Sequence, residues 1–555
     1  MLRQNPAIVF HADAVESEGK DLVGRRAAGE SFLRGWLRHA PGDEVAVVAQ
    51  TREGLRLFRE RMAALGHDHA VRDWTLRGDD FTEAGTLFFP SPGYLDAAWR
   101  RQRFGPERCS LVGITHTMST RRAIEGLHRL LSEPVESWDA IICTSRAVRS
   151  VVQRQFELEA EYFRTRFGAA RVPMPELPLI PLGINAADFR RDGRDREEMR
   201  ARNGAPEGAF VVLTVGRLTM VEKANMIPLF QVLQSLTGRI GRPVHLWMSG
   251  WASRDPEREL HERGAREIAP DVVTRMLDGR DPEVRRRVWS GADVFTLPVD
   301  SIQETFGLVP VEAMAAGLPV VMPDWNGFRD TVLHGETGFL IPTRTAPPGA
   351  VAQIARRFAN GTDDYLRHLA IVQQQTAIDL PAYLAAFVDL AGDPALGRRM
   401  GEAGARHVRE RFDWSAVVPQ YLALADHLSE RRKGVKPTTP RRASGPPNPL
   451  EVDPFDLYRH YPTAPLGQTD HVRRGEPMTS ERLAMLDSVN GRDLYRRKVL
   501  NRAQLMSLLA AVPEEGGTPK EISRGAGLPL AHVLAGLLFL AKHGAVRLDP
   551  REPTA

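Results

Sequence analysis

The chain has 555 residues, of which 42% are hydrophobic and 26% are charged, and this length is too great for one ordinary core, so we expect several domains. The formal net charge of +4 is small for this length and does not by itself indicate a nucleic-acid-binding protein. The two cysteines, Cys109 and Cys143, are too few for a disulfide framework or a zinc cluster. Because acidic residues also appear early at the N-terminus, where a signal peptide would be apolar, we expect a cytoplasmic protein.

The first part of the chain, residues 7–190, alternates short apolar runs with helical segments. Runs such as AIVFHA and EVAVVA are typical of β-strands, and segments such as RAVRSVVQRQF have the period of a helix. This alternation predicts a parallel sheet with helices on both faces. The pattern restarts at FVVLTVG (210–216), so residues 1–190 and 191–400 are predicted to be two doubly wound, Rossmann-like α/β domains that face a cleft.

The rest of the chain differs in composition. A longer helical insertion is expected at 343–398, and long amphipathic helices are expected at 401–430. Residues 431–450 are rich in proline and basic residues and predict a disordered linker. Residues 451–555 are predicted to be a small, mainly α module, in which a helix, a glycine turn, a helix and a short strand resemble a winged helix.

The segment most informative about chemistry is 293–327, which reads as strand, loop, helix and strand. The residues 306–309 would lie at the N-terminus of the helix, where free backbone N–H groups and the helix dipole favour an anion such as phosphate. Gly307 would let the backbone approach that anion closely. Glu312 stands in an apolar helix, LVPVEAMAAG, where a carboxylate needs a hydrogen-bond partner such as a ribose diol. Taken alone, Glu312 would more simply be a solvated helix-face residue.

The run ETFGLVPVEAMAAGLPVV, followed by DTVLHGETGFLIP at 330–342, resembles the signature of the retaining glycosyltransferases of family four, which have the GT-B fold. The resemblance covers roughly residues 5–430 and implies that the helices at 401–430 return to the first domain. Further matching segments occur in the expected order: IICTSRAVRSVV, LIPLGINAADF, VVLTVGRL with Lys223, and GARHVRERFDWSAVVPQYLAL.

The resemblance also implies a donor site around this signature. Glu304 would lie beside the donor sugar and hold its hydroxyl groups, and Glu312 would bind the nucleotide ribose. The groups that would contact the diphosphate are the backbone N–H groups of Phe306, Gly307 and Leu308. A UDP-sugar or a GDP-sugar is the expected donor, and no other cofactor is expected.

Two cations complete the implied site. Arg217 and Lys223 would neutralise the leaving diphosphate, and they would be catalytic because that charge develops in the transition state. Lysine is scarce here, since Lys20 and Lys223 are the only two in the first 430 residues. The spacing between Arg217 and Lys223 is one residue longer than expected for the family, and no glycine follows Lys223. In this family the cations and the helix dipole replace a metal ion, so no metal site is expected.

The first domain contributes two further candidates. His116 ends a strand and matches a family histidine near the transferred sugar, although a purely structural histidine is an equally good interpretation. The loop EGKDLVGRRAAGESF resembles the glycine-bearing first loop of the family, but Gly24 and Gly29 frame it in place of the usual double glycine. The adjacent Arg25 and Arg26 would bind an anionic acceptor or the donor phosphate, or would simply lie in solvent.

The predicted activity is therefore hexosyl transfer from a nucleotide-sugar to an unidentified acceptor, with retention of anomeric configuration and without a metal. The alternatives are a GT-B nucleotide-sugar epimerase and a non-catalytic regulator that binds a sugar nucleotide and acts through the C-terminal module. The second helix of that module, LPLAHVLAGLLFLAKHG, is apolar nearly throughout, so a protein partner is expected rather than nucleic acid. The basic linker leaves a peripheral membrane contact open.

Overall fold

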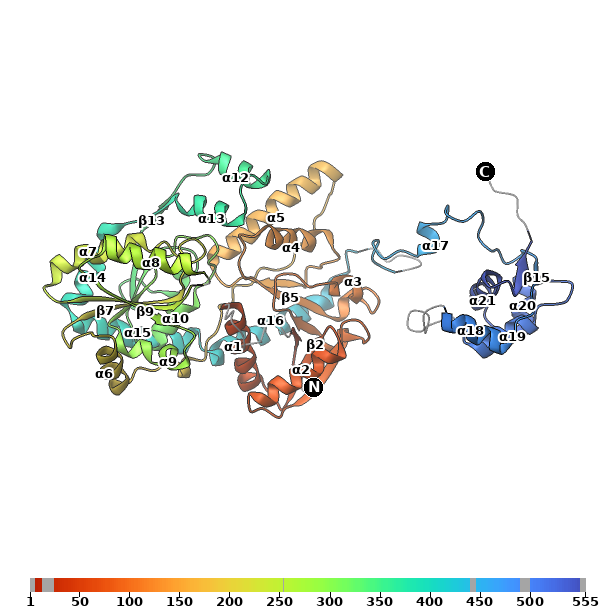
Figure 1. The fold of residues 1–555 in the computed structure, drawn as a ribbon, viewed down its shortest axis with the longest axis horizontal. Coiled ribbons are helices and arrows are strands. Elements are labelled where there is room, and N and C mark those ends of the chain that lie inside the picture. Colours follow the sequence, from red (N-terminus) through yellow and green to blue (C-terminus); the bar gives the residue numbers. More distant parts are fainter. Residues whose placement is uncertain (1–4, 12–23, 253, 440–445, 490–499, 550–555) are drawn as a thin grey trace. The chain divides into compact units, whose positions relative to one another are not determined.

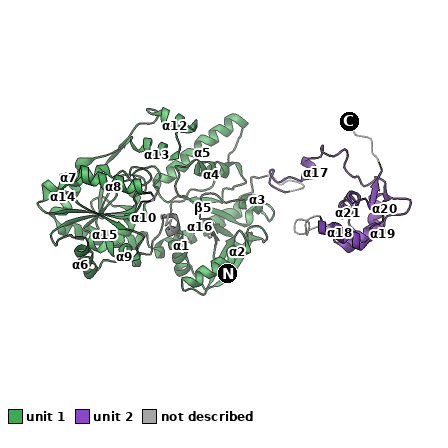
Figure 2. Cartoon of the chain, in the orientation of Figure 1, with its two compact units in different colours: residues 1–441 green, residues 442–555 purple. Residues whose placement is uncertain are grey.

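The structure is a computed structural model in which residues 5–11, 24–252, 254–439, 446–489 and 500–549 are described. It divides into two compact units, residues 1–441 and 442–555, each with its own hydrophobic core (Figure 1, Figure 2). The stretch 440–445 of the predicted linker lies outside the described residues.

The first unit contains two six-stranded parallel sheets, which confirms the prediction of two doubly wound domains (Figure 1). The first sheet has the order β3-β2-β1-β4-β5-β6 and consists of β1 (Ala7–Phe10), β2 (Glu44–Ala49), β3 (Ala70–Thr75), β4 (Thr86–Phe88), β5 (Ser110–Ile114) and β6 (Ala140–Ile142). The second has the order β12-β11-β10-β7-β8-β9 and consists of β7 (Phe210–Arg217), β8 (Val244–Trp251), β9 (Val273–Asp278), β10 (Val294–Thr296), β11 (Val320–Pro323) and β12 (Gly338–Ile341). The strand order reverses between β1 and β4 and between β7 and β10, and such a switch point is where open parallel sheets bind ligands.

Helices cover both faces of each sheet, so the central strands are buried and apolar on both sides. The helices of the first domain are α1 (Gly24–His39), α2 (Arg52–Ala64), α3 (Ala97–Arg101), α4 (Arg121–Ser132) and α5 (Arg146–Phe167). Those around the second sheet are α6 (Gly193–Arg202), α7 (Ile227–Ile240), α8 (Asp255–Ile268), α9 (Pro282–Gly291), α10 (Leu308–Ala315), α11 (Phe328–Thr331), α14 (Leu380–Gly392) and α15 (Pro394–Arg411).

One strand of the first sheet was missed by the sequence pattern. The edge strand β3 carries the charged residues Arg72 and Asp73, so it lacks the apolar run that marks the inner strands. Its neighbour β2 shows the usual pattern, with every residue after Glu44 buried.

The last helix of the first unit, α16 (Trp414–Gly434), returns to the first sheet and packs against α1. Trp414 fits closely here, because a Cβ atom added at Gly35 or Gly183 would lie only 2.1 or 2.5 Å from its ring. The prediction that the linker starts at residue 431 is wrong. Residues 431–434 are the end of α16, where the Arg432 guanidinium donates a hydrogen bond to Ser110 Oγ at 2.6 Å.

The predicted helical insertion is narrower than 343–398. The strands β13 (Thr343–Thr345) and β14 (Thr376–Ile378) pair antiparallel and enclose the helices α12 (Ala352–Ala359) and α13 (Tyr365–Gln373). By contrast, α14 packs against α7 and buries Tyr383 and Phe387 in the core of the second domain. Only the segment 343–378 therefore stands outside the doubly wound fold.

The second unit is a small helical bundle with a two-stranded sheet. Its elements are α17 (Pro454–Leu457), β15 (Val472–Arg474), α18 (Ser480–Val489), α19 (Arg502–Ala510), α20 (Pro519–Ala526), α21 (Leu530–Lys542) and β16 (Val546–Leu548). The helices α20 and α21 meet at a 107° bend, in the range of helix-turn-helix pairs. In α21 the residues Val533, Leu537 and Leu540 are buried in the core of this unit. In the described part of the chain, no helix is by itself long and apolar enough to cross a membrane, and only the bent α20–α21 pair would pass such a test together.

Candidate functional site

Two loops meet at the switch point of the second sheet. One loop follows β7 and carries Lys223, and the other follows β10 and carries Glu304; β7 and β10 are hydrogen-bonded neighbours, so both loops leave the same edge. The Lys223 Nζ lies 2.7 Å from the Glu304 Oε2, and the two side chains are only 20% and 17% exposed. The lysine and the glutamate of the predicted donor site thus form a largely buried ion pair.

The backbone of β7 gives Lys223 the room to reach Glu304. Gly216 has a φ of 147°, and a Cβ atom at this position would lie 3.3 Å from Lys223 Cε. The aliphatic stem of Lys223 therefore crosses Gly216 directly, and a larger residue there would push the stem aside. This path accommodates the longer spacing between Arg217 and Lys223.

The Glu304 carboxylate is held in its ionised form. Burial alone would raise its pKa, but the charge and hydrogen bond of Lys223 and the backbone N–H groups of Thr305 and Phe306 together hold the pKa below its usual value. The Thr305 N–H donates to Glu304 Oε1 at 3.1 Å. Glu304 is therefore an acceptor of hydrogen bonds at neutral pH.

Arg217 ends β7 beside this pair and has a partner that the sequence did not reveal. Its guanidinium Nη1 lies 3.6 Å from the carboxylate of Glu222, and both side chains are 27% exposed. Two cations and two carboxylates therefore alternate along the crevice: Arg217, Glu222, Lys223 and Glu304. Each cation is therefore held by a carboxylate of its own, Arg217 by Glu222 and Lys223 by Glu304.

Gly307 is the N-cap of α10 and has a φ of 81°. A Cβ atom at Gly307 would lie 2.2 Å from the ring of Phe328. The glycine is therefore required by close packing inside the protein, in addition to any approach of a ligand. The first N–H groups of α10, which include Leu308, have no partner within the helix, and they point out at the switch point beside Phe306.

Glu312 lies just over one turn into α10 and is half-buried. Burial raises its pKa to about 7, and the charges of Lys223 and Arg285 only partly oppose this. Among the described residues, its carboxylate accepts no hydrogen bond, whereas the carboxylate of Glu304 accepts several. An acid in this state is a suitable partner for a ligand hydroxyl pair.

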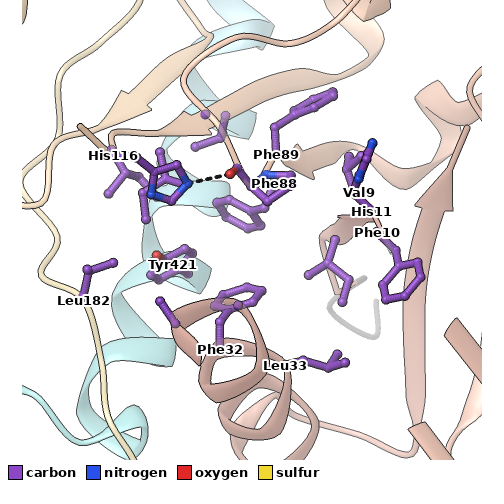
Figure 3. Close-up of a pocket in the computed structure, with 18 of the residues that line it drawn as sticks. Val9, Phe10, His11, Phe32, Leu33, Phe88, Phe89, His116, Leu182 and Tyr421 are labelled. Carbon is purple, nitrogen blue, oxygen red and sulfur yellow. Dashed lines mark hydrogen bonds between the residues drawn. The ribbon is translucent and has the colours of Figure 1, made fainter. Parts of the chain in front are cut away.

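The switch point of the first sheet opens into a mostly apolar cavity (Figure 3). The ends of β1 and β4 contribute Phe10 and Phe88, and α1 contributes Phe32. His116, just after β5, lies at the rim, and its Nε2 is 2.6 Å from the carbonyl oxygen of Pro90 (Figure 3). The predicted residue Gly24 begins α1, with Arg25 and Arg26 in its first turn, and their side chains lie outside the described residues.

Two hydrogen bonds join the two domains beside the loop that carries Glu304, and no sequence signal indicated them. Ser145, which caps α5, donates a hydrogen bond to the carbonyl oxygen of Thr305 at 2.8 Å. The backbone N–H of Arg146 donates to Asp330 at 2.6 Å.

Asp300, another missed residue, follows β10 and is 4% exposed, and burial raises its pKa to about 7. An acid at the end of the buried apolar run that contains β10 was the one clue to it.

Comparison with known proteins agrees with this architecture. Residues 209–360 match the family model described as "Glycosyl transferases group 1". The chain is 32% identical over 358 residues to the D-inositol 3-phosphate glycosyltransferase of Streptomyces avermitilis, which covers 60% of this chain and 66% of that protein. It is 30% identical over 287 residues to the protein of the same name from Streptomyces bingchenggensis, over 50% of this chain and 52% of that protein. The chain thus spans about half to two thirds of the curated relatives it matches.

Among solved structures, the sucrose-phosphate synthase from Thermosynechococcus elongatus aligns with 77% of this chain and 100% of its own, with a TM-score of 0.44 and 18% identity. The two parallel sheets with facing switch points define a two-domain α/β protein of the GT-B class. The match of residues 209–360 to the group 1 model and the similarity to the D-inositol 3-phosphate glycosyltransferases agree with a family-four-like glycosyltransferase.

Proposed function

We propose that this protein transfers a sugar from a nucleotide-sugar to an acceptor, with retention of anomeric configuration. The observation that carries the proposal is the buried Lys223–Glu304 pair at the switch point of the second sheet, next to the N-terminus of α10. This arrangement offers a cation, an ionised carboxylate and free backbone N–H groups within one crevice. A nucleoside diphosphate linked to a sugar needs these three kinds of partner.

Arg217, Lys223 and the start of α10 would bind the diphosphate. When the bond between the anomeric carbon and the phosphate oxygen breaks, negative charge grows on that oxygen. Cations and N–H groups already in place stabilise this charge without rearrangement, which lowers the barrier. Lys223 would exchange part of its contact with Glu304 for the phosphate, and the freed Glu304 oxygen would accept hydrogen bonds from the sugar hydroxyls.

Retention would follow from attack on the face that the phosphate leaves. The acceptor oxygen would form the new bond to the anomeric carbon, and its proton would pass to the departing phosphate oxygen. The resemblance to family four supports this same-face course. It also supports a reaction that needs no metal, with a hexosyl donor carried by UDP or GDP. Glu312 would accept hydrogen bonds from the nucleotide ribose.

The acceptor would bind at the first sheet, where the cavity beside His116 opens. Its walls are largely aromatic and aliphatic, so they suit an apolar group of the acceptor. The His116 Nε2–H donates to the carbonyl oxygen of Pro90 at the rim, which would place the His116 ring near the reacting sugar.

A panel of nucleotide-sugars tests the proposal with the full chain. Binding is measured by calorimetry, and cleavage is measured by release of the nucleoside diphosphate. Binding of one or more donors with slow cleavage by water is expected, and no binding across the panel would overturn the proposal. Product analysis separates the alternatives, because an epimerase would yield an isomerised sugar and a regulator would bind without turnover. The match to group 1 glycosyl transferases favours neither alternative.

A further inference from the structure

The segment 343–378 is an addition to the second domain, and its helix α13 lies over that domain on the side of the first domain (Figure 1). The β13–β14 hairpin ties its two ends together, with Thr343 opposite Ile378. The chain can therefore leave and rejoin the fold without disturbing the sheet. Its position raises the question of what the inserted helices contact.

The C-terminal end of α13 holds both donor loops. Gln373 is 2% exposed, and its amide Nε2 donates to the carbonyl oxygen of Met220 at 2.9 Å and to Asp300 Oδ1 at 2.6 Å. Met220 belongs to the loop that carries Lys223, and Asp300 belongs to the loop that carries Glu304. Asp300 also accepts the backbone N–H of Asn225 at 3.2 Å. One buried side chain from the insertion thus links the two loops of the candidate donor site.

The N-terminal end of α13 reaches across to the first domain. The Tyr365 hydroxyl lies 2.8 Å from Ser119 Oγ and donates to Gln303 Oε1 at 3.2 Å. Because a phenol has one proton, donation to Gln303 leaves its oxygen to accept from Ser119. Ser119 lies three residues after His116, and Gln303 directly precedes Glu304. The Tyr365 hydroxyl therefore joins the loop at the acceptor cavity to the loop at the donor site.

The surroundings of Tyr365 are those of the donor crevice. The ring is half-buried, and burial raises the pKa of its phenol. The charges of Glu222 and Arg217 also act on the phenol, in opposite directions, so both groups lie within electrostatic range of Tyr365.

We propose that the insertion is part of the reaction site, with Tyr365 as the residue that positions the acceptor-side loop against the donor-side loop and Gln373 as the residue that sets the donor loops. The inference rests on the proposed function. It gives the two residues different tasks. Gln373 shapes the binding of the diphosphate, whereas Tyr365 acts only when the two domains must be aligned for the sugar to leave the phosphate. Closure of this kind completes a site and excludes water.

The two tasks predict different kinetic effects. Tyr365→Phe keeps the ring but removes the hydroxyl, so the affinity for free nucleoside diphosphate should stay within about twofold while kcat for donor cleavage falls about tenfold. Ser119→Ala removes the other partner and should show the same split. Gln373→Ala leaves Asp300 without its amide donor, so affinity for the diphosphate should fall about tenfold as well.

The experiment measures UDP and GDP binding by calorimetry and donor cleavage at saturation for each full-length variant. Tyr162→Phe, at an exposed site on α5, and Gln374→Ala, exposed at the end of α13, are the matched controls and should equal the wild type. Melting temperatures near that of the wild type show that the variants are folded.

Three results decide between the proposals. The expected split in Tyr365→Phe and Ser119→Ala supports the inference. A kcat unchanged in both variants, in a wild type that cleaves donor, overturns the inference and leaves the proposed function intact. A wild type that neither binds nor cleaves any donor overturns both.

Discussion

Replacing Lys223 with methionine removes its charge and preserves the stem that crosses Gly216. In the proposed reaction, Lys223 stabilises the diphosphate as it leaves, so kcat for donor cleavage should fall about 100- to 1,000-fold, as when a fixed partner of a developing charge is lost. The structure also supplies a rival explanation. Lys223 lies 2.7 Å from Glu304, and it could serve only to keep that carboxylate ionised.

The strength of the Lys223–Glu304 ion pair determines how strongly the loss of Lys223 affects the ionisation of Glu304. Two unit charges about 4 Å apart attract by about 4 kcal/mol at the effective dielectric of a partly exposed site, and desolvation offsets part of this attraction. A net coupling of about 1–3 kcal/mol between Lys223 and Glu304 is therefore expected. Losing the lysine should also raise the pKa of Glu304, so the acid limb of the pH–rate profile should move to higher pH.

A double-mutant cycle separates the two explanations. Lys223→Met and Glu304→Gln are measured alone and together, with donor cleavage at saturation and thermal unfolding as readouts. Lys433→Met, an exposed lysine at the end of α16 that is 68% exposed, is the matched control. If Lys223 acts on the phosphate, Lys223→Met should still lower kcat at least 30-fold in the Glu304→Gln background. A double variant with the activity of Glu304→Gln alone would refute a role on the leaving group.

Three further predictions concern other parts of the chain. The pKa of Glu312 is raised to about 7, so ionisation of this acid destabilises the folded state, fully above pH 7 and not at all below about pH 4.5. Glu312→Gln should therefore stabilise the protein by about 1–3 kcal/mol at pH 8 and hardly at pH 4.5, while weakening donor binding at pH 8. An equal change in stability at both pH values would contradict this. The Arg101–Asp139 pair is fully buried, with a nitrogen–oxygen distance of 2.6 Å. Asp139→Asn should therefore lower the free energy of unfolding in urea by about 3–5 kcal/mol without altering nucleotide affinity. Asp96→Asn, at a 54% exposed site, should change the free energy of unfolding little. Because the two units have separate cores, a chain of residues 1–441 should cleave donor within about threefold of the full-length rate; complete loss would show that the C-terminal unit takes part in the reaction.

Much of the second domain could be predicted from the sequence, because its signals are local. The run before and after Gly307 specifies strand, loop and helix in sequence, and the helix start needs no distant partner to be recognised. The edge strand β3 was missed because its charged residues Arg72 and Asp73 interrupt the apolar pattern that marks a strand.

The contacts that unite the site could not be predicted, because they join residues far apart in the chain. Tyr365 meets Ser119 across 246 positions, and Gln373 meets Asp300 across 73. Glutamine and tyrosine in an inserted helix look like surface residues until the fold places them. The reach of Lys223 depended likewise on the φ of Gly216, which no spacing in the sequence encodes.

The central claim is tested most directly by the anomeric configuration of the sugar that the protein releases. An α-linked nucleotide-sugar from the panel is incubated with the full-length protein, and the first product is observed by proton NMR before the free sugar equilibrates. The α-anomer should appear first, with release of the nucleoside diphosphate and with loss of the signal in Lys223→Met. Initial release of the β-anomer would contradict retention at this site.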